Sequence, residues 1–158
     1  MSIEKVKNYL KEFGREDVLE FETSSATVEL AAQAAGVIPA RITKTLAFQS
    51  EDGCIVVAVA GDAKIDNKKF KDTFSIKARM LSPEQTLAFT GHAVGGVCPF
   101  ALPSTVKAYA DVSLKRFETV FPAAGSSNSA VEVTCEELFQ YGRCEKWVDV
   151  CKGWEENA

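Results

Sequence analysis

Arg41-Ile42-Thr43-Lys44-Thr45-Leu46-Ala47-Phe48 and Cys54-Ile55-Val56-Val57-Ala58-Val59-Ala60 stand on either side of the turn Glu51-Asp52-Gly53. Two strand-forming runs joined by a short turn that contains glycine predict a β-hairpin. The second run is apolar at every position, which favours a strand covered on both faces. We therefore expect a sheet that contains one fully buried strand.

Helical patterns occur before and after this hairpin. The first has an apolar face, with Ser2 able to cap its start and Gly14 able to end it. Further along, Ser82 precedes a proline at a helix start, and Thr134 with Glu137 forms a capping box. The predicted helices span residues 2–13, 26–35, 66–74, 83–91 and 135–141.

Additional strands are expected between these helices, at residues 18–21, 75–80, 105–109, 119–121 and 130–133. Strands and helices alternate without a strict βαβ repeat, which predicts an α/β fold of the mixed, α+β kind. No repeat, low-complexity stretch or linker divides the sequence. The length of 158 residues then suits a single domain covering 1–158.

Composition limits the possible partners. The net charge of -4 is unusual for a protein that binds duplex DNA without specificity, although contact with one end of an RNA needs only a local basic patch. The sequence has no run of eighteen apolar residues and no signal peptide at its start, so we expect neither a membrane partner nor export.

The five cysteines include no C-x-x-C pair, and the chain has one histidine. This pattern predicts no metal site and no cofactor, and it suits reduced thiols in the cytoplasm.

Lys44 lies in the first strand of the hairpin, where alternation places it on the same face as Ile42, Leu46 and Phe48. One interpretation is a lysine at a strand end whose stem packs on apolar neighbours. The other is a cation directed into a cleft, where it would hold a phosphate or a developing oxyanion. The strand pattern by itself leaves both interpretations open.

The segment Gly91-His92-Ala93-Val94-Gly95-Gly96-Val97-Cys98-Pro99-Phe100 is the most unusual of the chain. Paired glycines allow close approach of a ligand to backbone N–H groups, as in an oxyanion hole, but they also occur in ordinary turns. Cys98 could be a nucleophile only with His92 as its base, and no third group nearby orients them. A buried structural role is the simpler interpretation of both residues.

Two polar segments are weaker candidates. Ala123-Ala124-Gly125-Ser126-Ser127-Asn128-Ser129 either lines a pocket or forms a solvated turn. A basic cluster is either a solvated helix face or an RNA-backbone patch. Its members are Lys64, Lys68, Lys69, Lys71, Lys77 and Arg79. The sequence contains no G-x-S-x-G elbow, P-loop or G-x-G-x-x-G motif.

Taken together, these segments resemble the YbaK family, which includes a bacterial Cys-tRNA(Pro) deacylase and the editing domain inserted in many prolyl-tRNA synthetases. The resemblance spans nearly the whole chain and rests on the order and spacing of four features. These are the Lys44-Thr45-Leu46 strand, Gly61-Asp62 with Ile65-Asp66 and a lysine-rich helix, the Gly95 to Pro99 loop, and the Gly125 loop between two strands.

The resemblance implies a curved, barrel-like mixed sheet surrounded by helices, and it implies hydrolysis of the ester that joins an amino acid to the terminal ribose of tRNA. Lys44 would be the catalytic residue that places the terminal nucleotide. The residues implied to bind the substrate are Thr45, Gly95, Gly96, Val97, Cys98, Pro99, Gly125, Ser126 and Ser129. The RNA contacts would come from Lys64, Lys68 and Lys69.

The implied partners are the 3′ end of aminoacyl-tRNA and, as a candidate, prolyl-tRNA synthetase. The chain departs from the Cys-specific deacylase in having Cys98 in place of serine, and its Gly125 loop lacks that enzyme's Lys-Arg-Gly and following Asp. The amino acid removed therefore stays open among cysteine, alanine and other small residues. Two alternatives are a binding module that holds aminoacyl-tRNA or a synthetase without hydrolysis, and an unrelated thiol enzyme that uses Cys98.

Overall fold

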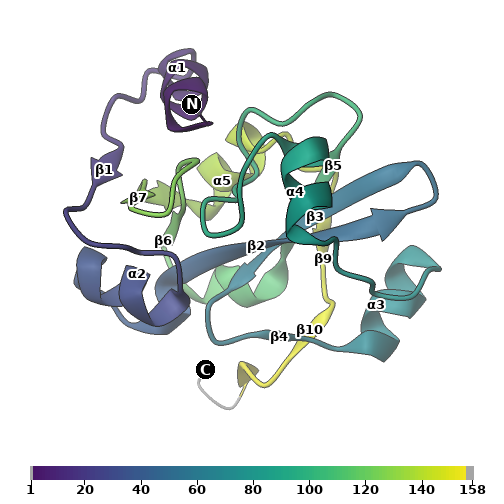
Figure 1. Ribbon diagram of the computed structural model, residues 1–158. Coiled ribbons are helices and arrows are strands. Elements are labelled where there is room, and N and C mark those ends of the chain that lie inside the picture. The colour runs from purple at the N-terminus through teal and green to yellow at the C-terminus, as the bar shows by residue number, and fades with distance from the viewer. Residues whose placement is uncertain (1, 156–158) are drawn as a thin grey trace.

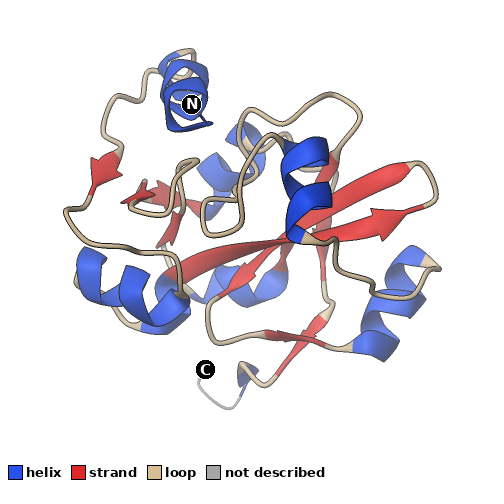
Figure 2. Cartoon of the chain, viewed as in Figure 1, coloured by secondary structure: helices blue, strands red, loops and turns tan. Residues whose placement is uncertain are grey.

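The computed structural model describes residues 2–155, whose centre is a curled six-stranded mixed sheet (Figure 1). The strand order is β8-β6-β2-β3-β5-β9. The bounds of these strands are β2 Ile42–Ser50, β3 Gly53–Ala60, β5 Lys107–Asp111, β6 Thr119–Pro122, β8 Val133–Thr134 and β9 Trp147–Val148. The predicted curved sheet with surrounding helices is confirmed (Figure 2).

The hairpin predicted from the sequence is β2 and β3, which pair antiparallel from Thr43 opposite Ala60 to Ser50 opposite Gly53. Every residue from Cys54 to Ala60 is buried. Val57 belongs to one apolar cluster and Val56 to another, so both faces of β3 are covered as expected.

The structure contains a helix at each of the predicted positions. Local capping explains their ends: Asp66 accepts hydrogen bonds from two N–H groups of the first turn of α3, and Ser82 and Thr134 form full capping boxes on α4 and α5. The second helix is shorter than predicted because Thr27, and not Ser25, is its cap. The bounds are α1 Ser2–Lys11, α2 Val28–Ala35, α3 Asn67–Phe74, α4 Pro83–Thr90 and α5 Cys135–Tyr141, with short 3-10 turns at Pro39–Arg41 (η1) and Val112–Arg116 (η2).

The strand predicted at residues 75–80 is wrong. Ser75 adopts a left-handed conformation that ends α3, and only Met80 bridges to the sheet, opposite Phe48. The strand predicted at 130–133 is instead two short strands, β7 Ser129–Ala130 and β8. β7 pairs with β1 Leu19–Glu20, and β4 Lys64–Ile65 pairs with β10 Cys151–Lys152, outside the main sheet.

Three loops beside the sheet are held together by close packing. A side chain at Gly96 would come within 2.8 Å of the backbone N of Ser126, and one at Gly125 would come within 2.8 Å of the carbonyl O of Ser2. The loop after α4, the loop after β6 and the start of α1 therefore form one packed unit. None of the helices within residues 2–155 is long and apolar enough to cross a membrane.

Candidate functional site

A cavity of about 220 Å³ opens beside β2. It is bordered by residues from 25–31 at the start of α2, 42–47 of β2, 80–86, 94–97 and 121–130. Many of these side chains are small, among them Ala26, Ala31, Ala47, Gly95 and Ala123. A wall of small side chains leaves room for a compact ligand group.

The cavity lies where β2 has a free edge. β6 pairs with β2 only at Ile42 and Thr43. The next hydrogen bond on this side of β2 is the one that Ala47 O accepts from Leu81 N, at 3.0 Å. Between these two pairings the edge is open, so side chains from both faces of β2 border the cavity.

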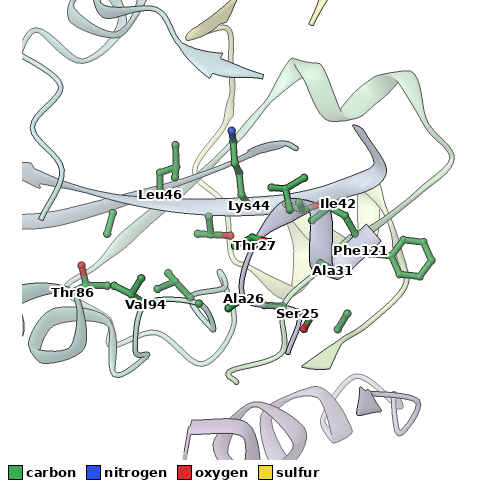
Figure 3. A pocket seen from close by; sticks show the side chains of 18 of the residues that line it. Ser25, Ala26, Thr27, Ala31, Ile42, Lys44, Leu46, Thr86, Val94 and Phe121 are labelled. Atoms are coloured by element: carbon green, nitrogen blue, oxygen red, sulfur yellow. The ribbon is translucent and has the colours of Figure 1, made fainter. Parts of the chain in front are cut away.

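The two faces of β2 contribute different chemistry. Figure 3 shows Lys44 and Leu46 on one side of the strand, with Ala26, Thr86 and Val94 on the other. Gly95 and Val97 also line the cavity, next to Ala26. Lys44 and the loop that contains Gly95 and Val97 thus line one cavity from opposite sides of the β2 edge.

Lys44 is half-buried. Burial lowers the pKa of its ammonium group, and the nearby Cys151 thiol, Asp62 and Glu29 oppose this shift. Asp62 is itself held by Arg116, whose Nη1 lies 2.9 Å from its carboxylate. A half-buried cation beside a cavity is suited to an anionic ligand group such as a phosphate.

Thr43 and Thr45 project from β2 to the face opposite Lys44, because successive side chains of a strand alternate. They are 3% and 9% exposed, and neither hydroxyl has a hydrogen-bond partner within residues 2–155. Buried hydroxyl groups are normally paired, so two unpaired hydroxyls on neighbouring positions of one strand face are unusual.

The other predicted substrate residues divide into two groups. Thr45, Gly95, Val97 and Ser129 line the cavity. The rest do not line it, and among them Gly96 and Gly125 allow the loops to pack together. This second group consists of Gly96, Cys98, Pro99, Gly125 and Ser126.

His92 and Cys98 are buried with Cys98 Sγ 3.6 Å from His92 Nε2, but the other hydrogen bonds of the ring prevent this nitrogen from acting as a base. His92 Nε2 lies 2.8 Å from the carbonyl O of Phe100, which can only accept, so Nε2 carries the proton. Nδ1 is then left to accept from the Ser2 hydroxyl. Burial also raises the pKa of the Cys98 thiol to about 12, which disfavours the thiolate that a nucleophile needs.

The predicted RNA-binding lysines lie outside the cavity, Lys64 in β4 and the other two in α3. Lys68 forms an exposed ion pair with Asp72 at 3.4 Å. Lys69 lies 3.2 Å from Asp149 and donates to the carbonyl O of Cys151. Within residues 2–155, no three His, Cys, Asp or Glu side chains are grouped so as to hold a metal ion.

The sequence reasoning missed several residues that border the cavity, notably Thr43, Met80 and Val94. Met80 and Val94 are 61% and 62% exposed, which is high for apolar side chains at a cavity mouth. A signal for Thr43 was present, since a polar residue two positions from Thr45 on the same face of a mostly buried strand is unusual.

Several known proteins resemble this chain in sequence or in fold. The sequence profile of a family described as the aminoacyl-tRNA editing domain matches residues 22–141. The uncharacterized protein YwhH of Bacillus subtilis strain 168 is 56% identical over 157 residues, covering 98% of this chain and 100% of YwhH. A proline–tRNA ligase of Thermosipho melanesiensis is 32% identical over 126 residues, which are 78% of this chain but 22% of the ligase.

Among solved structures, the crystal structure of a candidate trans-editing enzyme for prolyl tRNA synthetase matches with a TM-score of 0.87 and 29% identity, covering 96% of this chain and 98% of that one. The profile match spans most of the chain, and the structural match extends over almost all of it. The chain therefore belongs to the YbaK-like family of aminoacyl-tRNA editing domains and is related to proteins associated with prolyl-tRNA synthetase.

Proposed function

We propose that this protein is a trans-editing deacylase that hydrolyses the ester of mischarged tRNA. The observation that carries the proposal is the cavity at the β2 edge, which is bordered by Lys44 on one face of the strand and by Ala26 on the other (Figure 3), where Gly95 packs next to Ala26. The 3′ end of an aminoacyl-tRNA also has two chemically different parts. They are an anionic nucleotide and a small acyl group, which are joined by one ester bond.

In this arrangement the two sides of the edge have separate roles. The Lys44 ammonium holds the phosphate and ribose of the terminal nucleotide, while the aminoacyl group enters the side lined by Gly95, Ala26 and Ala47. Fixing both ends places the scissile ester beside the strand edge. Attack then comes from water or from a hydroxyl of the ribose, so neither Cys98 nor His92 is needed as nucleophile or base.

The substrate we propose is tRNA(Pro) carrying a small amino acid such as cysteine or alanine. The walls of the cavity, which include Ala26, Ala31 and Ser129, favour small side chains by shape. The chain has a net charge of -4, so its contacts with tRNA are expected at the 3′ end, with Lys64, Lys68 and Lys69 as a local basic patch and a prolyl-tRNA synthetase as a candidate supplier of tRNA recognition.

The test is a deacylation assay on tRNA(Pro) charged separately with cysteine, alanine, serine and proline. We expect release of at least one small amino acid, with prolyl-tRNA(Pro) spared. The panel should be repeated on tRNA(Ala) and tRNA(Cys) carrying their own amino acids, to separate recognition of the tRNA from recognition of the acyl group.

The competing function is a binding module without hydrolysis. It predicts that the protein protects aminoacyl-tRNA from spontaneous hydrolysis and never accelerates it. Protection of every member of the panel would therefore replace our proposal with this one.

A further inference from the structure

On the side of β2 that faces away from β3, Thr45 has no neighbouring strand within residues 2–155. Thr43 pairs with Pro122 of β6, and Ala47 O accepts a hydrogen bond from Leu81 N. Thr45 lies midway between these two pairings and lines the cavity. On its other side it lies opposite Ala58 of β3.

The direction of the Thr45 peptide groups follows from the ladder. The N–H and C=O of one strand residue point to the same side, and this side alternates along the strand. Ala47 O bonds to Leu81 N at 3.0 Å and Gln49 N bonds to Arg79 O at 2.8 Å, so both of these residues direct their peptide groups away from β3. Thr45, two residues before Ala47, directs its N–H and C=O the same way, into the open edge.

Thr45 therefore has three polar atoms without a protein partner within residues 2–155. Its peptide N–H and C=O point into the open edge beside the cavity, and its hydroxyl Oγ1 is buried on the face of the strand. Buried polar groups are almost always hydrogen-bonded. The gap in the pairing along this edge spans one residue, which is the length of one amino acid.

We propose that Thr45 binds the aminoacyl group of the substrate as if it were a single residue of an antiparallel strand, an inference that rests on the proposed function. The Thr45 N–H donates to the ester carbonyl oxygen, and the Thr45 C=O accepts from the α-ammonium group. This is the two-bond pattern of a hydrogen-bonded antiparallel pair. It gives recognition of the shared part of every α-amino acid, independent of side chain.

The antiparallel direction fixes where the rest of the substrate lies. The acyl carbon and its ribose extend from Thr45 toward Lys44 and Thr43, because the N–H side of a strand residue faces the carboxyl end of its antiparallel partner. Side chains of such a pair share one face of the sheet, so the substrate side chain lies with the Thr45 side chain and the Gly95 loop. In this orientation the substrate side chain faces the Gly95 side of the cavity and the nucleotide lies toward Lys44, which agrees with the role proposed for Lys44.

The same bond acts during hydrolysis. Attack by water forms a C–O bond at the carbonyl carbon, and the carbonyl oxygen takes up the negative charge beside the Thr45 N–H. When the tetrahedral species collapses, the bond to the ribose oxygen breaks, the carbonyl re-forms, and the ribose oxygen leaves as a hydroxyl with the proton lost by the water. A donor aimed at the developing oxyanion speeds this step.

The peptide N–H can be removed selectively. Thr45→Pro lacks the donor, and the Thr45 N–H points away from β3, so the β2–β3 ladder keeps its bonds. Thr45→Val removes the hydroxyl and keeps the N–H. We expect deacylation to fall about 10²–10³-fold in Thr45→Pro, and at least about tenfold further than in Thr45→Val. Thermal unfolding of each variant verifies that it is folded.

A second measurement does not depend on folding of the proline variant. Addition of a 3′-aminoacylamino-adenosine, in which an amide replaces the ester, should shift the Thr45 amide resonance of the wild-type protein and slow its hydrogen exchange. The amide of Phe48, which lies in the β2–β3 ladder and outside the cavity, is the reference. N-acetylation of the analogue should weaken binding at least about tenfold, because a neutral amide donates less strongly than an ammonium.

The results distinguish this inference from the proposed function. A folded Thr45→Pro protein that is as active as Thr45→Val, or a Thr45 amide that is unchanged at saturating analogue, would overturn the role of Thr45. A wild-type protein that releases no amino acid from any tRNA contradicts the deacylase assignment instead, while the resonance of Thr45 still tests binding.

Discussion

Lys44 and Thr45 are consecutive in the sequence, yet they border the same cavity from opposite faces of β2. The interruption of pairing between Thr43 and Ala47 makes this possible, because the cavity reaches around an open strand edge. A charged residue and an uncharged polar residue thereby border one cavity from opposite faces of the strand. The division sets the expectations for the variants below.

Lys44→Ala is expected to reduce deacylation by about 10²–10³-fold while the protein stays folded. The side chain is half-buried and contributes charge more than core volume. The assay is single-turnover hydrolysis of the mischarged tRNA that the wild type prefers.

The matched control for this variant is Lys107→Ala, an exposed lysine on β5 of the same sheet that lies outside the cavity. It should behave as the wild type. Undiminished hydrolysis by folded Lys44→Ala protein would exclude Lys44 from the reaction.

Cys98 is expected to be inert toward alkylating reagents in the folded protein. It is fully buried, burial raises the pKa of its thiol to about 12, and His92 Nε2 is already bonded to Phe100. Mass spectrometry after brief iodoacetamide treatment should find Cys98 unmodified in native protein and modified in urea. Rapid labelling of Cys98 together with loss of activity would instead favour a thiol enzyme.

Gly96→Ala should both destabilise the protein and lower its activity. The added carbon would lie 2.8 Å from the backbone N of Ser126, so two loops that hold the cavity wall must separate. Overpacking of this kind costs about 1–3 kcal/mol. The measurements are urea unfolding and deacylation at a temperature where the variant is folded.

Gly14→Ala is the comparison for this substitution. Its added carbon meets no atom within 4 Å, but its φ of +77° makes alanine unfavourable there. It should lose stability and keep its activity. Equal losses of activity in both variants would argue that stability alone, and not the loop position, limits turnover.

Stability should fall as the pH is lowered from about 7.5 to 5.5. Burial lowers the pKa of His92 below its ordinary value of about 6.5, and the nearby charge of Lys5 adds to this. The unfolded chain therefore binds a proton in a range where the folded protein does not, so the free energy of unfolding is lost as the pH falls from the unfolded pKa toward the folded one. His92→Gln should show a flatter pH dependence in urea unfolding, and identical slopes would refute this origin.

Charge reversal at Lys68 is expected to weaken tRNA binding only modestly and to reduce its salt dependence. Lys68 is highly exposed, and its ion pair with Asp72 is of the kind that contributes little, so the ammonium is available to a phosphate. One lost phosphate contact changes the slope of log K against log salt by about 0.7–1. Filter binding of Lys68→Glu and of the control Lys107→Glu at salt concentrations from about 50 to 200 mM measures this slope. Equal slopes would remove Lys68 from the RNA contact.

Local features of the chain could be predicted well. The β2–β3 hairpin, the Asp66 cap and the two capping boxes depend on residues within a few positions of each other. The prediction of a strand at 75–80 was wrong because the alternating apolar residues of this segment pack against the core. The segment forms one bridge to the sheet in place of a ladder. Strands of two residues, such as β4 and β10, have too little sequence to carry a periodic signal.

The candidate site shows the same limit of local sequence patterns. The sequence by itself determined that Lys44, the Gly95 to Pro99 loop and Cys98 were the chemical candidates, and the order and spacing of its segments indicated the family. Only the tertiary structure decided that Gly95 faces the cavity while Gly96 and Gly125 pack loops together, and that the Thr43 and Thr45 hydroxyls have no partner within the described residues 2–155. The physical reason is that the open edge of β2 exists because β6 stops pairing at Thr43 and residues 79–81 begin only at Ala47. Where neighbouring segments start and stop along a strand depends on contacts between residues far apart in the chain, which no local pattern encodes.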